Sequence, residues 1–342
     1  MTQWNVLTAL AALITLATPI LVDRGDYTIH AEKLGTGTPM VILPGGPGFS
    51  GKAVWAIAFG TRSNITSYLF DQLGTGKSHP KIPNQDPTNL ISLNKTIEDI
   101  ESIRKSEKHD KWIVCGQSWG AIVALVYAAR YPDRVHHLIL TSIPGIGYDA
   151  TILGTNLNRA IPEPLSKQLV EIELDATLSP AEKVSAQLQL ITPYYFFSHQ
   201  SGDYYLSLAP AELFEPKVFI SLQKHILNSA DYYDDLTKLP KTKFPVTLIQ
   251  GHQDPTGAAM PYLLKEQFLP RAKVNMINQA GHFPWIENSD AFFTAFYADL
   301  GIKPPAFVTE YEDEDVMQKE NDARTKNGWP FNYIPPAVNS KN

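Results

Sequence analysis

Short apolar runs separated by longer and more polar stretches are the feature that most constrains the fold of this chain. Most of them are continuous, bounded by Gly, Pro or Asp, and without alternation of polar and apolar residues. They are Met40–Leu43, Ser67–Phe70, Trp112–Cys115, His137–Thr141, Val246–Gln250 and Lys273–Ile277. Continuous apolar runs of this length are typical of strands buried in a parallel sheet.

Helix-length segments lie between these runs. Thr96–Ser106 carries mixed charge, Trp119–Arg130 is almost wholly apolar, and Ser289–Asp299 is aromatic on one side. Strands that alternate with helices predict an α/β fold with a doubly wound, mostly parallel sheet. We assign this core to residues 23–146 and 240–301.

Residues 147–239 break the alternation. They contain no clear strand, several prolines and many Tyr and Phe residues. We expect an inserted helical cap, in which most aromatic side chains pack on one another and the rest line a pocket over the sheet.

The two ends of the chain differ from its middle. Residues 1–22 carry no charge, and Val6 to Val22 form an apolar run slightly shorter than the roughly 20 residues of a spanning helix. This pattern favours a secretory or membrane-anchoring segment. We therefore expect the protein to be exported or anchored, with membrane contact only through this segment. The alternative is an N-terminal helix that packs on the body of the protein. Residues 302–342 form an acidic, aromatic extension to which we assign no chemistry.

Charge and cysteine content exclude several function classes. The 342 residues have a net charge of −6 and no dense basic run, so we expect no nucleic-acid partner. The single cysteine, Cys115, excludes an internal disulfide and a cysteine-based zinc site. It should be buried and inert. We expect neither a metal nor an organic cofactor.

The segment Gly116-Gln117-Ser118-Trp119-Gly120 joins an apolar run to an apolar helix. A G-x-S-x-G sequence between a strand and a helix forms a nucleophile elbow, whose tight turn needs small flanking residues. We therefore predict that Ser118 is a nucleophile exposed at the end of the sheet.

A glycine-rich loop, Pro44-Gly45-Gly46-Pro47-Gly48, follows the first apolar run. In a fold of this kind, that loop and the residue after the nucleophile supply the oxyanion hole. We assign its donors to the backbone N–H groups of Gly46 and Trp119, or Gly45 if the register is shifted by one.

An acid and a base follow the last two apolar runs. A serine hydroxyl needs a base within hydrogen-bond reach, and a carboxylate must orient that base. Asp254 and His282 fit these roles, and the chain order Ser118, Asp254, His282 is that of α/β-hydrolases. His252 competes as the base, but its place on the loop of Asp254 leaves it little room to face Ser118.

At this point the chain resembles the proline iminopeptidase group of α/β-hydrolase-fold serine peptidases, over roughly Tyr27 to Leu300. The resemblance rests on Gly45 to Gly48, on Asp71-Gln72-Leu73-Gly74-Thr75-Gly76-Lys77-Ser78 and on Gly116 to Gly120. The family usually shows His-Gly-Gly-Pro-Gly, Asp-Gln-Arg-Gly-Ser-Gly-Arg-Ser and Gly-Gly-Ser-Trp-Gly there. The resemblance implies a Ser118, Asp254, His282 triad and a cap that selects the substrate.

The chain departs from the family pattern in places. Pro44 stands where His is usual, and Leu73 stands where Arg is usual. Family aminopeptidases bind the free amine of the substrate with cap glutamates, often beside a tryptophan, and residues 147–239 contain no tryptophan. The candidate glutamates are Glu171, Glu173, Glu212 and Glu215.

These observations predict a serine hydrolase that acts through an acyl-enzyme on a small peptide, ester or amide. The first hypothesis is an aminopeptidase, with N-terminal proline the first substrate to test. The alternatives are an esterase or amidase of small apolar acyl groups, an acyltransferase, and a non-catalytic receptor. Asp at the elbow would be expected of epoxide hydrolases and haloalkane dehalogenases, and Ser118 argues against both.

Overall fold

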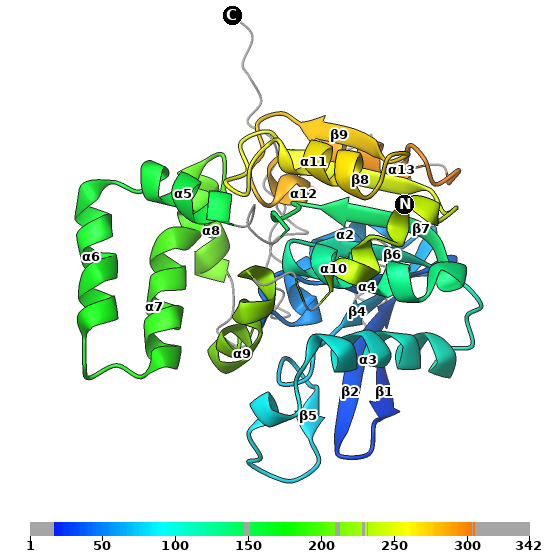
Figure 1. The fold of residues 1–342 in the computed structure, drawn as a ribbon, viewed down its shortest axis with the longest axis horizontal. Coiled ribbons are helices and arrows are strands. Elements are labelled where there is room, and N and C mark those ends of the chain that lie inside the picture. Colours follow the sequence, from blue (N-terminus) through cyan, green and yellow to red (C-terminus); the bar gives the residue numbers. More distant parts are fainter. Residues whose placement is uncertain are drawn as a thin grey trace, which may run out of the picture.

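A nine-stranded sheet forms the centre of the molecule, with β1-β2-β4-β3-β6-β7-β8-β9 in order and β5 paired to β2 (Figure 1). The computed structural model describes residues 17–146, 151–208, 213–227, 230, 232–302 and 304. The strands are β1 (Thr18–Asp23), β2 (Tyr27–Leu34), β3 (Thr38–Leu43), β4 (Ile65–Phe70), β5 (His79–Pro80), β6 (Trp112–Gln117), β7 (Val135–Thr141), β8 (Val246–Gly251) and β9 (Lys273–Ile277).

The six neighbouring strands β4, β3, β6, β7, β8 and β9 are all parallel. They correspond to the six apolar runs predicted as strands from the sequence. Their side chains alternate between two cores, because successive residues of a strand point to opposite faces. In β3, Val41 and Leu43 join one hydrophobic cluster, whereas Met40 and Ile42 join the other. Burial on both faces explains the continuous apolar runs, and the predicted mostly parallel α/β fold is confirmed.

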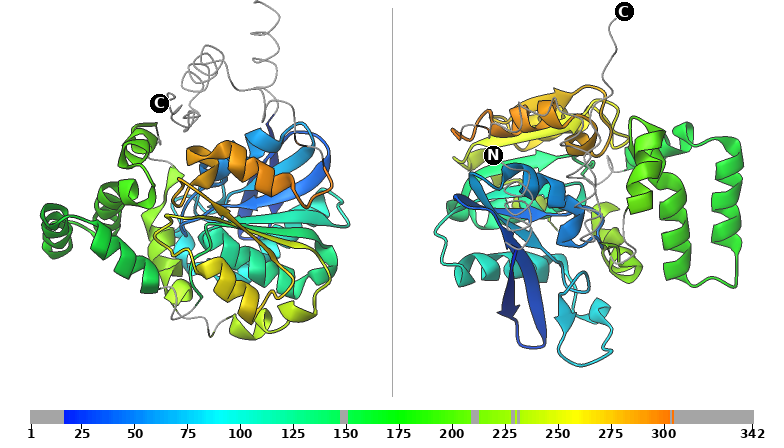
Figure 2. Two further views of the ribbon diagram at one scale, coloured as in Figure 1. Left: turned by 90° about the horizontal axis from the view of Figure 1, so that it is seen from above. Right: turned by 180° about the vertical axis from the view of Figure 1, so that it is seen from behind.

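Helices cover both faces of the sheet, as the view from above shows (Figure 2). One layer contributes α3 (Leu93–Ser106), α4 (Trp119–Arg130) and α11 (Met260–Gln267) to the first cluster. The other contributes α2 (Trp55–Thr61), α12 (Pro284–Glu287) and α13 (Ser289–Tyr297) to the second. The almost wholly apolar sequence of α4 follows from its position, since every residue from Trp119 to Ala129 is buried.

Antiparallel strands extend one edge of the sheet and were not predicted. β1 pairs with β2, and β2 pairs with β4 and β5. The end of the uncharged N-terminal run is thus an edge strand, β1, rather than part of a helix. Residues 1–16, most of that segment, lie outside the described residues, as does the extension after Ile302 apart from Pro304. No helix within the described ranges is long and apolar enough to cross a membrane.

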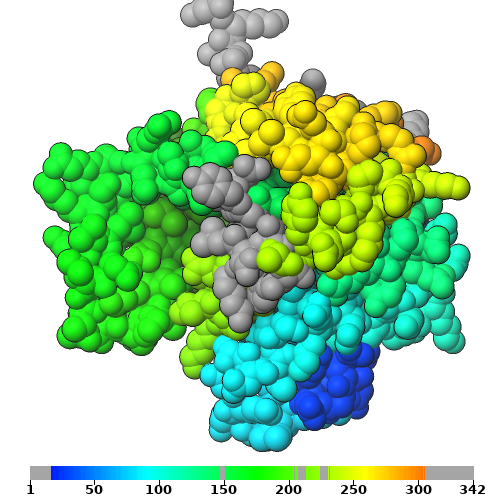
Figure 3. All heavy atoms as spheres, in the orientation of Figure 1, coloured from blue at the N-terminus to red at the C-terminus, as the bar shows by residue number. Residues whose placement is uncertain are grey.

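The cap region, residues 147–239, stands to one side of the sheet, and α6 and α7 project farthest from it (Figures 1 and 3). Its helices are α5 (Thr151–Ala160), α6 (Glu163–Leu174), α7 (Pro180–Ile191), α8 (His199–Leu208), α9 (Pro216–Leu227) and α10 (Tyr233–Leu236), with the 3-10 turn η5 (Thr192–Tyr195) before α8. The last of them, α10, packs on α4 and so belongs to the core layer.

Backbone hydrogen bonds join the cap region to the core at two loops. Glu215 donates its N–H to the carbonyl of Gly48 at 2.8 Å, in the glycine-rich loop after β3. His282 donates its N–H to the carbonyl of Tyr195 at 2.7 Å, in the loop after β9. The cap region therefore contacts the core at two of the loops that the sequence singled out.

Candidate active site

Ser118 occupies the turn between β6 and α4 in a strained backbone conformation. Its φ of 54° and ψ of −122° lie in a region that residues other than glycine rarely adopt. The turn is tight on both sides, because a Cβ on Gly116 would lie 2.3 Å from the carbonyl oxygen of Gly120. The elbow thus presents Ser118, half-buried, to the cavity above the sheet.

His282 and Asp254 are buried together at the ends of the neighbouring strands β9 and β8. The Nδ1 atom of His282 lies 3.0 Å and 2.9 Å from the two carboxylate oxygens of Asp254. Both residues are about 4% exposed. A buried carboxylate on Nδ1 favours the tautomer whose free Nε2 can accept a proton.

Two further residues that the sequence analysis missed hold the carboxylate of Asp254. Thr256 donates its backbone N–H and its hydroxyl to Oδ1, at 2.8 Å and 2.7 Å. Gln250 donates its Nε2 to Oδ2 at 2.9 Å and accepts the N–H of Ile143 with its Oε1 at 2.7 Å. The sequence could have indicated Gln250, because a polar side chain at the end of a buried strand needs hydrogen-bond partners.

The glycine-rich loop after β3 lies beside Ser118. Gly45 and Gly46 line the same cavity as Ser118 and His282. Among the described residues, no acceptor pairs with the N–H of Gly46 or of Trp119. Both groups predicted as oxyanion donors are thus free of internal acceptors.

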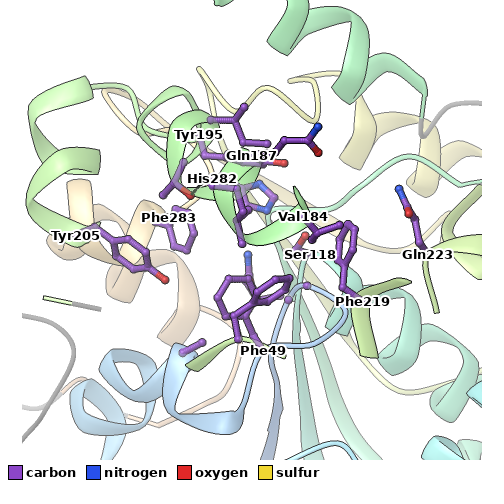
Figure 4. A pocket seen from close by; sticks show the side chains of 18 of the residues that line it. Phe49, Ser118, Val184, Gln187, Tyr195, Tyr205, Phe219, Gln223, His282 and Phe283 are labelled. Atoms are coloured by element: carbon purple, nitrogen blue, oxygen red, sulfur yellow. Dashed lines mark hydrogen bonds between the residues drawn. The ribbon is translucent and has the colours of Figure 1, made fainter. Parts of the chain in front are cut away.

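A cavity of about 460 Å³ lies between the elbow and the cap region. Figure 4 shows Ser118 and His282 on this cavity, together with Phe49, Phe219 and Tyr205. Most of its wall is aromatic or aliphatic, and the cap region contributes Glu173, Val184, Gln187, Leu188, Ile191, Thr192, Tyr195, Tyr205, Phe214, Phe219 and Gln223. Phe196, in contrast, is buried in the second core cluster, so the cap aromatics divide between packing and lining, as expected.

The predicted cap glutamates occupy different places. Glu173, near the end of α6, lines the cavity and accepts a hydrogen bond from Nε2 of Gln187 at 3.0 Å. Glu171 and Glu173 are both exposed on this helix, and neither Glu171 nor Glu215 belongs to the lining. Glu212 lies outside the described residues.

The other residues considered in the sequence analysis, His252 and Cys115, do not line the cavity. His252 is exposed. Cys115 is fully buried, and burial raises the pKa of its thiol to about 12, which keeps the thiol protonated and unreactive. The described residues contain no cluster of His, Cys, Asp or Glu that could hold a metal ion.

Comparison with known proteins agrees with the fold. Residues 38–162 match the family model of the alpha/beta hydrolase fold. The chain is 28% identical to a proline iminopeptidase of Arabidopsis thaliana, over 75% of this chain and 72% of the relative. It is 27% identical to a proline iminopeptidase of Neisseria meningitidis, over 75% of this chain and 87% of the relative.

Solved structures extend the likeness at the level of the fold. A proline iminopeptidase-related protein from Thermus thermophilus superimposes with a TM-score of 0.63 at 20% identity, covering 85% of this chain and 99% of that one. The predicted resemblance to proline iminopeptidases is confirmed by the similarity to the two sequence relatives.

Proposed function

We propose that this chain, a hydrolase with the α/β-hydrolase fold that resembles proline iminopeptidases, is a serine aminopeptidase that releases the first residue of small peptides. The observation that carries the proposal is the cavity that Ser118, His282 and Glu173 line together. It brings together a nucleophile, a base held by a carboxylate, and an acidic group suited to a free amine.

The proposed reaction has two halves. His282 takes the proton of the Ser118 hydroxyl as that oxygen attacks the carbonyl of the substrate, and Asp254 stabilises the imidazolium that forms. The N–H groups of Gly46 and Trp119 stabilise the oxyanion, with each donor contributing about 2.7–4 kcal/mol. His282 then protonates the leaving amine, and water hydrolyses the ester on Ser118.

Glu173 would select the substrate. Its carboxylate is the one acidic side chain among the described residues that line the cavity, and the surrounding wall is mostly apolar. A protonated amine placed there would form a charge-assisted hydrogen bond, which contributes about 1.5–3 kcal/mol when the bound substrate shields the pair from water. Of the four candidate glutamates, we therefore propose Glu173 as the ligand of the substrate amine.

The test compares hydrolysis of a prolyl arylamide with that of its N-acylated twin. In Ser118→Ala, kcat should fall by on the order of 10⁶. Glu173→Gln should lower kcat/KM about ten- to a hundred-fold for the free amine and leave the N-acylated substrate unchanged. Glu171→Gln is the matched control, because Glu171 lies on the same helix and outside the cavity.

A second candidate function is an esterase of small apolar acyl groups. It is favoured by the aromatic wall that Phe49, Phe214 and Phe219 give the cavity. Equal turnover of the two arylamides, or turnover of simple esters alone, would move the assignment to this function. Full biological effect of Ser118→Ala would instead indicate a receptor.

A further inference from the structure

The backbone of His282 is tied to two other parts of the molecule. Its N–H donates to the carbonyl of Tyr195 in the cap region at 2.7 Å. Its carbonyl accepts the hydroxyl of Ser142, after β7, at 2.8 Å. The position of the imidazole therefore depends on a cap segment as well as on the sheet.

The carboxylate of Glu287, at the end of α12, joins the loop of His282 to the cap region. Its Oε2 accepts the N–H of Gly281, the residue before His282, at 2.6 Å. Its Oε1 accepts the N–H of Ser198 in the cap region at 3.1 Å. Burial raises the pKa of this carboxyl, and its backbone N–H partners oppose that shift. One half-buried carboxylate thus bridges the His282 loop and the cap segment.

The two segments that Glu287 joins are in close contact along their length. A Cβ on Gly281 would lie 2.3 Å from the carbonyl oxygen of Tyr195. The rings of Phe196 and Phe283 stack with their centroids 4.7 Å apart and their planes within 10°. The cap segment Tyr195–Ser198 and the loop that carries His282 therefore pack as one unit.

We propose that Glu287 is a positioning residue, whose carboxylate holds the His282 loop against the cap segment Tyr195–Ser198 and thereby places the base for catalysis. This inference rests on the proposed role of His282 as the base. Glu287 does not line the cavity, so it acts through the backbone of Gly281 rather than by touching substrate. Carboxylate acceptors form hydrogen bonds about twice as strong as neutral ones.

Glu287→Gln tests the proposal, since the amide keeps the size of the side chain but replaces one acceptor oxygen with a donor. At least one of its backbone N–H partners then loses its acceptor. We expect kcat to fall about ten- to a hundred-fold, as small misplacements of catalytic groups do, with KM nearly unchanged. The downfield NMR resonance of the Nδ1 proton of His282 should shift or broaden, because that proton reports the bond to Asp254.

Glu182→Gln is the matched control. Glu182 also accepts a backbone N–H, that of Ser179 at 2.8 Å, but it caps α7 away from His282. This variant should lose cap-region stability and keep both kcat and the His282 resonance.

A second pair of variants covers the case in which Glu287→Gln fails to fold. Ser198→Pro removes one N–H that Glu287 accepts from the cap segment, whereas Ser198→Ala keeps it and loses only the hydroxyl that accepts the N–H of Ser201. Only the proline variant should lower kcat and alter the resonance.

Wild-type kcat and an unchanged His282 resonance in Glu287→Gln would overturn the proposal. Equal effects of Ser198→Pro and Ser198→Ala would also overturn it. Failure of the proposed function is distinguishable, because undiminished turnover by Ser118→Ala would reject the serine mechanism while the resonance still reports on Glu287.

Discussion

At the residue scale, the backbone conformation that exposes Ser118 destabilises the folded protein. Its φ of 54° with ψ of −122° costs on the order of 1–3 kcal/mol, and that cost is independent of the hydroxyl. We expect Ser118→Gly to be more stable than Ser118→Ala by about 1 kcal/mol, although both are inactive, because only glycine adopts this backbone without strain. Thermal unfolding of the two variants measures the difference.

The same pair of substitutions at Ser102 is the control for strain. Ser102 lies inside α3, where glycine should be less stable than alanine by roughly 0.5–1 kcal/mol. The same order of stability at both sites would show that the elbow is not strained.

At the scale of elements, two glycines inside cap helices differ only in their surroundings. A Cβ added to Gly154 in α5 would have no atom within 4 Å, whereas a Cβ on Gly202 in α8 would lie 2.4 Å from Cα of Pro193. Gly154→Ala should therefore stabilise the protein by about 0.4–1 kcal/mol. Gly202→Ala should destabilise it and lower activity, because it separates α8 from η5, which carries the cavity residue Tyr195.

Urea unfolding of the two alanine variants, with activity measured in parallel, checks this expectation. Stabilisation by both substitutions would mean that helix propensity outweighs the packing of α8 on η5.

At the scale of the whole molecule, two buried groups make stability depend on pH with opposite signs. Burial raises the pKa of Asp99 to about 6, against its bonds to Arg24 and Tyr27, and lowers the pKa of His137 to about 4. Folded Asp99 holds its proton more tightly than unfolded Asp99, so its contribution is present at low pH and lost as the pH rises through 6. The contribution of His137 is present above its unfolded pKa and lost as the pH falls towards 4.

Asp99→Asn and His137→Gln should separate these contributions. Between about pH 4 and 6.5, Asp99→Asn should gain stability relative to wild type by up to about 3 kcal/mol as the pH rises. His137→Gln should lose stability relative to wild type over the same interval. Urea titrations across this range measure both, and curves parallel to wild type would contradict the assignment of either group.

The sequence by itself determined the parallel strands and the residues at their ends. A strand buried on both faces must be apolar throughout, and the elbow around Ser118 needs its glycines within five consecutive residues, so both leave a local pattern. The antiparallel strands β1 and β2 left no such pattern, because they are partly exposed and β2 contains His30, Glu32 and Lys33.

Only the tertiary structure decided which polar groups meet. Glu171 and Glu173 are equivalent in the sequence, yet the packing of α6 brings Glu173 alone of the two to the cavity. Glu287 reaches Ser198, 89 residues away, because α12 and the cap segment fold onto the same loop. Contacts between residues so distant in the chain depend on how whole elements pack, and no short stretch of sequence records that packing.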